Sequence, residues 1–256
     1  MGAADTDSAV DFAVIGGTGF YKLAELGGVE RRHVDTPFGA PSADILLGDM
    51  GCRRVAFLAR HGEEHTLAPH RVNYRANLWA LRHVGVSRVL AVNAVGGIRA
   101  DMGPRCLAMP DQLIDYTWGR VASFGDVDGG AVRHVDFSDP YSPGWRRACL
   151  QAAARAGMPV VDGGCYGVTQ GPRLETRAEI ARMRRDGCDM VGMTGMPEAV
   201  LARELDMAYA CLAVVANWAA GCDPDALPEI SLDAIFAHLA AATAKVPGIL
   251  REIRTD

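Results

Sequence analysis

The stretch Cys188–Trp218, CDMVGMTGMPEAVLARELDMAYACLAVVANW, decides the fold class. It predicts a strand, a glycine-containing turn, a helix that opens at Pro197–Glu198, and a second strand. Tyr209–Ala216 is a nearly unbroken apolar run, as expected for a strand buried on both faces, and the polar Asn217 follows it. Ligands of open α/β sheets bind at the carboxyl ends of strands, so we expect Met193–Thr194 and Asn217 to face one crevice. An ordinary β-α-β unit with a polar strand exit explains the same pattern.

The rest of the chain alternates predicted strands and helices, which indicates an α/β fold. We expect a single-domain, three-layer structure over residues 1–256, with a mixed, mostly parallel central sheet flanked by helices. The predicted strands are Val10–Ile15, Asp44–Leu47, Arg54–Leu58, Arg88–Val92, Cys106–Tyr116 (broken by Pro110) and Gly164–Val168. The predicted helices are Asn73–His83, Trp145–Ala156, Glu175–Arg185 and a final one that Ser231 caps and that runs to about Ile249, ended or kinked by Pro247.

Composition limits the classes of function. The chain has 256 residues and a formal net charge of −5, which disfavours a nucleic-acid partner or an anionic membrane surface. No apolar run approaches the ~20 residues of a membrane span, and the first residues lack a signal-peptide pattern. The seven cysteines form no C-x-x-C pair, which predicts a cytoplasmic protein with neither a disulfide framework nor a zinc site. A catalytic cysteine stays an alternative, although buried structural thiols fit better.

Glycine-rich and basic residues follow several predicted strands. GGTG at 16–19 offers backbone N–H groups for an oxyanion, and Thr18 adds a hydroxyl. Lys22 stands where a dinucleotide-binding fingerprint needs a further glycine, and the Gly-Lys-Ser/Thr of a P-loop is absent, so neither a nicotinamide cofactor nor a triphosphate is favoured. A tight strand-to-loop turn accounts for GGTG equally well.

Arg60 and His61 also follow a strand directly. Arginine offers a planar fork of donors suited to phosphate, and histidine can donate beside it, although a lone arginine more often forms a surface ion pair. Asn93–Gly97 (NAVGG) repeats the pattern at another strand end, and Thr194 adds a fourth donor. These donors predict one site for a free oxyanion.

The motifs together resemble the purine nucleoside phosphorylase family, and most closely its methylthioadenosine phosphorylase branch. The motifs that carry the resemblance span nearly the whole chain in order: GGTGF, ARHG with NYRANLWAL, NAVGG, TQGPRLET and MTGMPEA. The resemblance implies a homotrimeric α/β enzyme of the nucleoside phosphorylase-like fold. It also implies that inorganic phosphate, as co-substrate, cleaves the N-glycosidic bond of a purine nucleoside, with no metal or organic cofactor.

The resemblance also implies roles for individual residues. Met193 would lie against ribose and base, with Trp218 and Ala219 beside the substrate, and His134, in HVDFSDPY, would reach into a neighbouring subunit's site near the 5′ group. Asn93 departs from the methylthioadenosine branch, which has a hydroxyl residue there. The residues that would hold phosphate are Thr18, Arg60, His61, Asn93, Ala94 and Thr194.

The chemistry of the reaction suits these residue types. C1′ of the ribose develops oxocarbenium character as the base leaves, phosphate supplies the nucleophile, and the departing purine needs a donor near N7 and O6. The work of the protein is therefore positioning and electrostatics, without a protein nucleophile. Asn217 is the expected donor to the base.

The same position predicts the base. The adenine-specific branch has carboxylates where this chain has Asn217 and Ala219. An amide can donate to O6 and N7, and an ionised Glu175 would accept from the N1–H of a 6-oxopurine. Mispaired buried polar groups discriminate by ~10⁴ or more. The alternative for Glu175 is an acid that satisfies the dipole at a helix start.

The final helix bears on the sugar. Leu232 and Ile235 are three residues apart and share a helix face, in the region that lines the 5′ pocket in the family. An apolar lining favours a 5′-methylthio group over a hydroxyl, although both are also ordinary core residues. S-methyl-5′-thioinosine is thus the expected substrate, ahead of inosine and guanosine.

Four alternatives remain at the level of sequence. Two are enzymes of the same class: a methylthioadenosine phosphorylase that tolerates Asn217, and a broad inosine and guanosine phosphorylase. A nucleoside-binding regulatory protein is disfavoured because it would not need the phosphate-site motifs. A dinucleotide-dependent enzyme is disfavoured by the missing glycine.

Overall fold

The computed structural model describes residues 9–125, 133–224 and 232–255. Within them, eleven strands form one mixed sheet. The strands are β1 Phe12–Gly16, β2 Gly27–Arg32, β3 Ile45–Met50, β4 Arg53–Ala59, β5 Arg88–Gly97, β6 Leu107–Met109, β7 Gln112–Asp115, β8 Val161–Asp162, β9 Cys165–Val168, β10 Met190–Gly192 and β11 Ala208–Trp218. The helices are α1 Tyr74–His83, α2 Pro143–Arg155, α3 Arg177–Arg185, α4 Glu198–Glu204, α5 Leu232–Thr243 and α6 Val246–Arg251, with a 3₁₀ turn at Pro69–Arg71.

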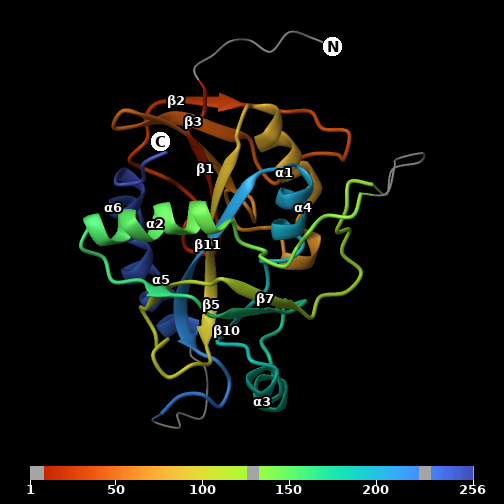
Figure 1. Cartoon of the computed structure of the whole chain (residues 1–256), viewed down its shortest axis with the longest axis vertical. Coiled ribbons are helices and arrows are strands. Elements are labelled where there is room, and N and C mark those ends of the chain that lie inside the picture. Colours follow the sequence, from red (N-terminus) through yellow and green to blue (C-terminus); the bar gives the residue numbers. More distant parts are fainter. Residues whose placement is uncertain (1–8, 126–132, 225–231, 256) are drawn as a thin grey trace.

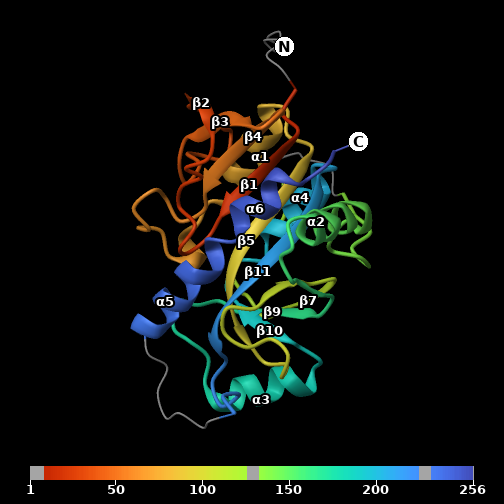
Figure 2. The same cartoon turned by 90° about the vertical axis from the view of Figure 1, so that its left-hand side faces the viewer.

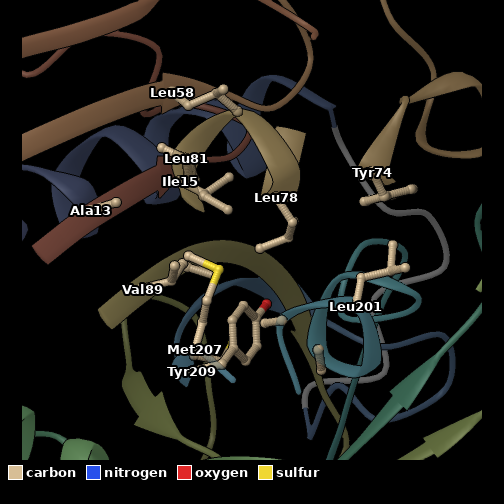
Figure 3. Close-up of a cluster of buried hydrophobic side chains, with 14 of the residues drawn as sticks. Ala13, Ile15, Leu58, Tyr74, Leu78, Leu81, Val89, Leu201, Met207 and Tyr209 are labelled. Carbon is tan, nitrogen blue, oxygen red and sulfur yellow. The ribbon is translucent and has the colours of Figure 1, made fainter. Parts of the chain in front are cut away.

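Helices cover both faces of the sheet, as Figure 1 shows. One apolar cluster joins the sheet to α1 and α4, and Figure 3 shows part of it, with Leu78 and Leu81 of α1, Leu201 of α4, and Ile15 and Tyr209 of the sheet among its labelled side chains. A second cluster joins the opposite face to α2, α5 and α6. The sheet is therefore the middle of three layers, and the predicted α/β fold with a mixed, mostly parallel sheet is confirmed.

The two longest strands, β5 and β11, lie side by side in the centre of the sheet (Figure 2). The strands β1, β4 and β11 all run parallel to the strand beside them in this region, so their carboxyl ends meet at one edge. Gly16 is opposite both Ala59 and Val92, which brings the residues that follow β1 and β4 next to Asn93. Pairing within the sheet thus gathers motifs that are far apart in the sequence.

The expected elements are largely present, with two differences at helix boundaries. The predicted Glu175–Arg185 helix begins at Arg177, because Thr176 caps it and Glu179 completes a capping box. Glu175 is therefore not the acid of the helix start. Pro247 lies in the first turn of a separate helix, α6, where proline is favoured, rather than ending a single long helix. The predicted cap Ser231 lies outside the described residues.

Candidate active site

A cavity of about 460 Å³ opens at the carboxyl edge of the sheet, where β1, β4, β5 and β11 end. It contains residues of both predicted groups. The predicted phosphate ligands in its wall are Thr18, Arg60, His61, Ala94 and Thr194. The predicted nucleoside contacts in its wall are Glu175, Met193, Asn217, Ala219 and Ile235. The edge of the sheet therefore joins a region of anion-binding groups to a region suited to a purine.

Three predicted residues lie elsewhere. Asn93 is fully buried behind the wall, and the Trp218 ring packs against Gly103, where an added Cβ would be 2.9 Å from it. His134 is exposed and does not line the cavity of its own chain. The side chain of Leu232 lies outside the part of the chain that the structure describes.

Arg60 is fully buried and forms an ion pair with Glu198, the first residue of α4. Its Nε donates to Oε2 at 2.7 Å and its Nη2 to Oε1 at 2.8 Å. Tyr209 donates its hydroxyl to the same Oε1 at 2.8 Å. Burial alone would lower the pKa of the guanidinium, but the Glu198 carboxylate outweighs it and raises the pKa above its ordinary value. The pair replaces the surface ion pair that sequence reasoning offered as the alternative.

Asn93 connects Arg60 to Thr194 through two hydrogen bonds. Nη2 of Arg60 donates to Oδ1 of Asn93 at 3.2 Å, and Nδ2 of Asn93 donates to Oγ1 of Thr194 at 2.9 Å. Because Thr194 accepts this bond, its own proton is directed elsewhere, and the residue lines the cavity. Asn93 therefore lies behind the wall of the cavity, which differs from its predicted direct contact with phosphate. In this position it orients the hydroxyl of Thr194.

Arg60 keeps one donor for the cavity. Nη1 donates to the Val92 carbonyl at 3.2 Å, so four of the five N–H groups are engaged within the protein. Gly17 lies directly over this nitrogen, because a Cβ there would be 2.8 Å from Nη1. A side chain at Gly17 would therefore cover the remaining donor, which is the physical reason for a glycine at this position of GGTG.

His61 presents an acceptor rather than the predicted donor. Its Nδ1 lies 2.8 Å from the Leu67 carbonyl, which can only accept, so Nδ1 carries the proton. Burial, and then the charge of Arg60, lowers the pKa of His61 to about 4, and the ring is neutral at pH 7. Nε2 is then an acceptor, suited to the P–OH group of a hydrogen phosphate ion.

Two side chains are suited to recognise a base. Glu175 is half-buried and accepts a hydrogen bond from the Thr169 hydroxyl at 2.6 Å. Desolvation raises the pKa of Glu175, although this hydrogen bond opposes the shift. Nδ2 of Asn217 donates to the Trp218 carbonyl at 2.6 Å, which leaves a second N–H and an oxygen of the amide.

A β-bulge aims Asn217 into the cavity. The register of β11 against β5 shifts between Val215 and Asn217, so that one extra residue is inserted opposite Gly96. Both Ala216 and Asn217 consequently line the cavity, which the regular alternation of a strand would not allow.

Sequence reasoning missed two features of the site. The sequence indicates Glu198 only as a residue at which a helix opens, and its burial against Arg60 carries no local sequence signal. His65 also lines the cavity, with its ring centroid 5.0 Å from that of His61. The signal for His65 was its place three residues after the ARHG motif, four residues after His61.

Comparison with known proteins agrees with this geometry. The sequence model of the Phosphorylase superfamily matches residues 11–253. A probable S-methyl-5′-thioinosine phosphorylase of Xanthomonas campestris is 59% identical over 248 residues, covering 97% of this chain and 98% of that protein. An S-methyl-5′-thioadenosine phosphorylase of Mycolicibacterium smegmatis is 51% identical over 210 residues, covering 81% and 77% of the two chains.

Solved structures give the same result. The crystal structure of a methylthioadenosine phosphorylase from an Antarctic soil metagenomic library superposes with a TM-score of 0.88 at 37% identity, covering 96% of this chain and 86% of that one. The protein therefore belongs to the phosphorylase superfamily.

The Arg60–Glu198 pair predicts a strong effect of Glu198→Gln. Neutralising the carboxylate leaves a buried guanidinium without its counter-charge, and we expect a loss of about 3–5 kcal/mol in the free energy of unfolding. Urea unfolding measures this loss. Glu63→Gln removes the carboxylate of an exposed pair with Arg31 and should change stability little. Equal effects of the two substitutions would contradict the buried pair's role.

His61 predicts a pH dependence of stability in phosphate-free buffer. An ordinary histidine has a pKa of about 6.5 and His61 one of about 4, so between these values the unfolded chain binds a proton that the folded protein does not. This part of the stability is present at neutral pH and is lost as the pH falls. We expect His61→Gln to lose less stability than the wild type between about pH 7 and about pH 5.

His33 provides the control for this measurement. It is exposed, and its hydrogen bond with Asp44 raises its pKa, so its contribution is present at low pH and is lost as the pH rises. His33→Gln should therefore lose more stability than the wild type on acidification. An unchanged pH dependence in His61→Gln would show that His61 is not held neutral by the fold.

Proposed function

We propose that this protein cleaves 6-oxopurine nucleosides by phosphorolysis, with S-methyl-5′-thioinosine as the preferred substrate. The products are hypoxanthine and 5-methylthioribose 1-phosphate. The observation that carries the proposal is a single cavity whose wall contains both the oriented anion donors and the amide of Asn217 with the carboxylate of Glu175. Close relatives with this reaction in their names support it.

Phosphate is the nucleophile in the proposed reaction. One of its oxygens forms a bond to C1′ while the C1′–N9 bond breaks, and the bonding electrons pass into the purine, which is then protonated. The free N–H of Arg60 and the hydroxyl of Thr194 hold the phosphate, and Nε2 of His61 accepts from its P–OH group. Thr18 and Ala94, also in the wall, complete the proposed phosphate site. The reaction requires neither a metal nor an organic cofactor.

Base recognition rests on two complementary hydrogen bonds. The one N–H of Asn217 that the Trp218 carbonyl leaves is shared between O6 and N7, which stabilises negative charge on the departing base, and Glu175 accepts from N1–H. The acceptor must be ionised, and burial opposes ionisation, so a hydrogen bond from the substrate would compensate for the lost solvation. A 6-aminopurine lacks the N1–H and carries a donor where Asn217 donates.

The sugar end of the site is apolar. Ile235 of α5 lines the cavity, and Met193 and Ala219 are near enough to share the wall. This lining suits a 5′-methylthio group, which needs no hydrogen-bond partner. Inosine and guanosine would bind with an unsatisfied 5′-hydroxyl, and methylthioadenosine would bind with a mispaired base. All three are therefore expected to be weaker substrates, and a broad inosine and guanosine phosphorylase and a methylthioadenosine phosphorylase are the two alternative functions. Family membership disfavours the nucleoside-binding regulatory protein, which was the non-enzyme alternative.

The proposal extends to the setting of the reaction. The substrates are small molecules, and the acidic chain suits neither nucleic acid nor membrane as a partner. The described helices include none long and apolar enough to cross a membrane. All seven cysteines are free thiols, which fits a cytoplasmic location.

The substrate profile tests the proposal directly. We expect methylthioinosine to give the highest kcat/KM among methylthioinosine, methylthioadenosine, inosine and guanosine, with cleavage dependent on phosphate. Asn217→Asp should lower kcat/KM for methylthioinosine and shift the ratio toward methylthioadenosine, because a second acceptor would face O6. Asn73→Asp makes the same change at the cap of α1, outside the cavity, and should leave the ratio unchanged.

Three results would each reject part of this assignment. Cleavage without phosphate would exclude phosphorolysis. A wild-type preference for methylthioadenosine, or an unchanged ratio in Asn217→Asp, would show that Asn217 does not recognise the base.

We further propose that the enzyme is a homotrimer in which His134 completes a neighbour's site. His134 is exposed and away from the cavity of its own chain, as this role requires. We expect sedimentation velocity to show a trimer. His134→Ala should raise KM for methylthioinosine without dissociating the trimer. A fully active monomer would contradict this arrangement.

A further inference from the structure

The guanidinium of Arg120 is bound mainly by oxygen atoms of two turns, with a longer hydrogen bond of 3.4 Å from Nη1 to the Tyr74 hydroxyl, and it lies outside the cavity lining. It belongs to the segment that follows β7 and is half-buried. Nη1 donates to the carbonyls of Met193 at 2.8 Å and Met196 at 2.6 Å. Nη2 donates to the carbonyls of Gln170 at 2.8 Å and Thr169 at 3.2 Å, and Nε to Oε1 of Gln170 at 3.1 Å. All five N–H groups are thus used.

The two turns carry or hold residues to which the proposed function assigns the phosphate and the base. The turn Met193–Met196 joins β10 to α4 and contains Met193 and Thr194, both in the cavity wall. The turn at Thr169–Gln170 follows β9, and the hydroxyl of Thr169 holds the carboxylate of Glu175. The planar guanidinium therefore holds the two turns at a fixed spacing. It thereby connects the turn that contains the Thr194 hydroxyl to the turn that holds the Glu175 carboxylate.

The charge of Arg120 is not neutralised in the way that the charge of Arg60 is. Its hydrogen-bond acceptors are neutral oxygens, and no carboxylate forms an ion pair with it among the described residues. The ring of Tyr74 faces the guanidinium, and Cζ of Arg120 lies 5.7 Å from the centroid of that ring. Arg60 is paired with Glu198 and His61 is neutral, so Arg120 adds positive charge behind the turn that contains Thr194.

We propose that Arg120 is a positioning residue for phosphorolysis, acting through the Met193–Met196 and Thr169–Gln170 turns. It holds Thr194 and Glu175 at the separation that a phosphate and a purine require when both are bound. Its charge also favours the dianion that Thr194 contacts. The inference rests on the proposed function of the cavity and adds a residue that the cavity wall does not contain.

Two substitutions separate the geometric role from the charge. Arg120→Met removes both, and Arg120→Lys keeps a point charge but cannot reproduce a planar fork of five donors. We expect Arg120→Met to lower kcat/KM by about 10²-fold, the size of effect that a misplacement of about 1 Å produces, and to raise KM for phosphate. Arg120→Lys should restore KM for phosphate while kcat stays low.

Arg146 offers a matched control. It is also an arginine that holds backbone carbonyls, since its Nε donates to Pro110 and its Nη2 to Met109, but it lies on α2 away from the cavity. Arg146→Met should lower the thermal midpoint without changing kcat/KM. All variants are assayed well below their own midpoints, with the nucleoside that the wild type cleaves fastest.

The outcomes distinguish the inference from the proposed function. A wild type that cleaves no purine nucleoside with phosphate rejects the function itself. An active wild type with kcat/KM equally affected in Arg120→Met and Arg146→Met overturns the positioning role. If Arg120→Met does not fold, Arg120→Lys decides, since a lowered kcat with an unchanged KM for phosphate supports the inference and an unchanged kcat overturns it.

Discussion

The site depends on the ion pair between Arg60 and Glu198, both fully buried. The pair joins the end of β4 to the start of α4 across 138 residues of sequence. Desolvating two charges is expensive, and a buried pair is stable only when its remaining groups are hydrogen-bonded, as Tyr209 does for Glu198. In return the guanidinium has one orientation. That orientation fixes Asn93, which fixes Thr194, so the direction of each hydrogen bond is set before any anion binds.

In the proposed phosphate site, the wall of the cavity would consequently hold an anion by oriented donors more than by net charge. Arg60 is neutralised by Glu198, and His61 is kept neutral by burial and by Arg60. Donors that are already in place need no reorganisation when charge develops, which is the most effective form of electrostatic stabilisation in a site closed to water. The charge of Arg120, behind the turn, adds attraction without an exposed cation in the cavity. A free cation in the wall would bind other anions as well.

Selectivity for the base has a separate structural origin. The bulge in β11 turns Asn217 inward, and Glu175 is held before α3 by Thr169 rather than at the helix start. The positions of both side chains depend on local backbone geometry. A substitution at either residue can change the side chain and leave that backbone geometry intact. This explains physically how proteins as similar to this chain as 51% identity can carry the name of a methylthioadenosine phosphorylase. In the proposed function, the two proteins share the fold, and the hydrogen-bonding character of a few side chains would select the base.

The sequence by itself determined the α/β class, the order of most elements and the strand-end motifs, because hydrophobic periodicity and turn residues are local properties. It also brought together Thr18, Arg60, His61 and Asn217, since parallel strands end at one edge of a sheet. Thr194 joins them by a different route, because it follows β10, which pairs antiparallel with the end of β5. Tertiary structure alone decided that Glu198 is the partner of Arg60, that Asn93 stands behind Thr194 and that His61 presents an acceptor. Tertiary structure also placed Trp218 against Gly103 and bound Arg120 to the two turns. Those facts are contacts and hydrogen-bond directions between residues distant in the chain, and packing of the helices on the sheet sets them, not the pattern of any one segment.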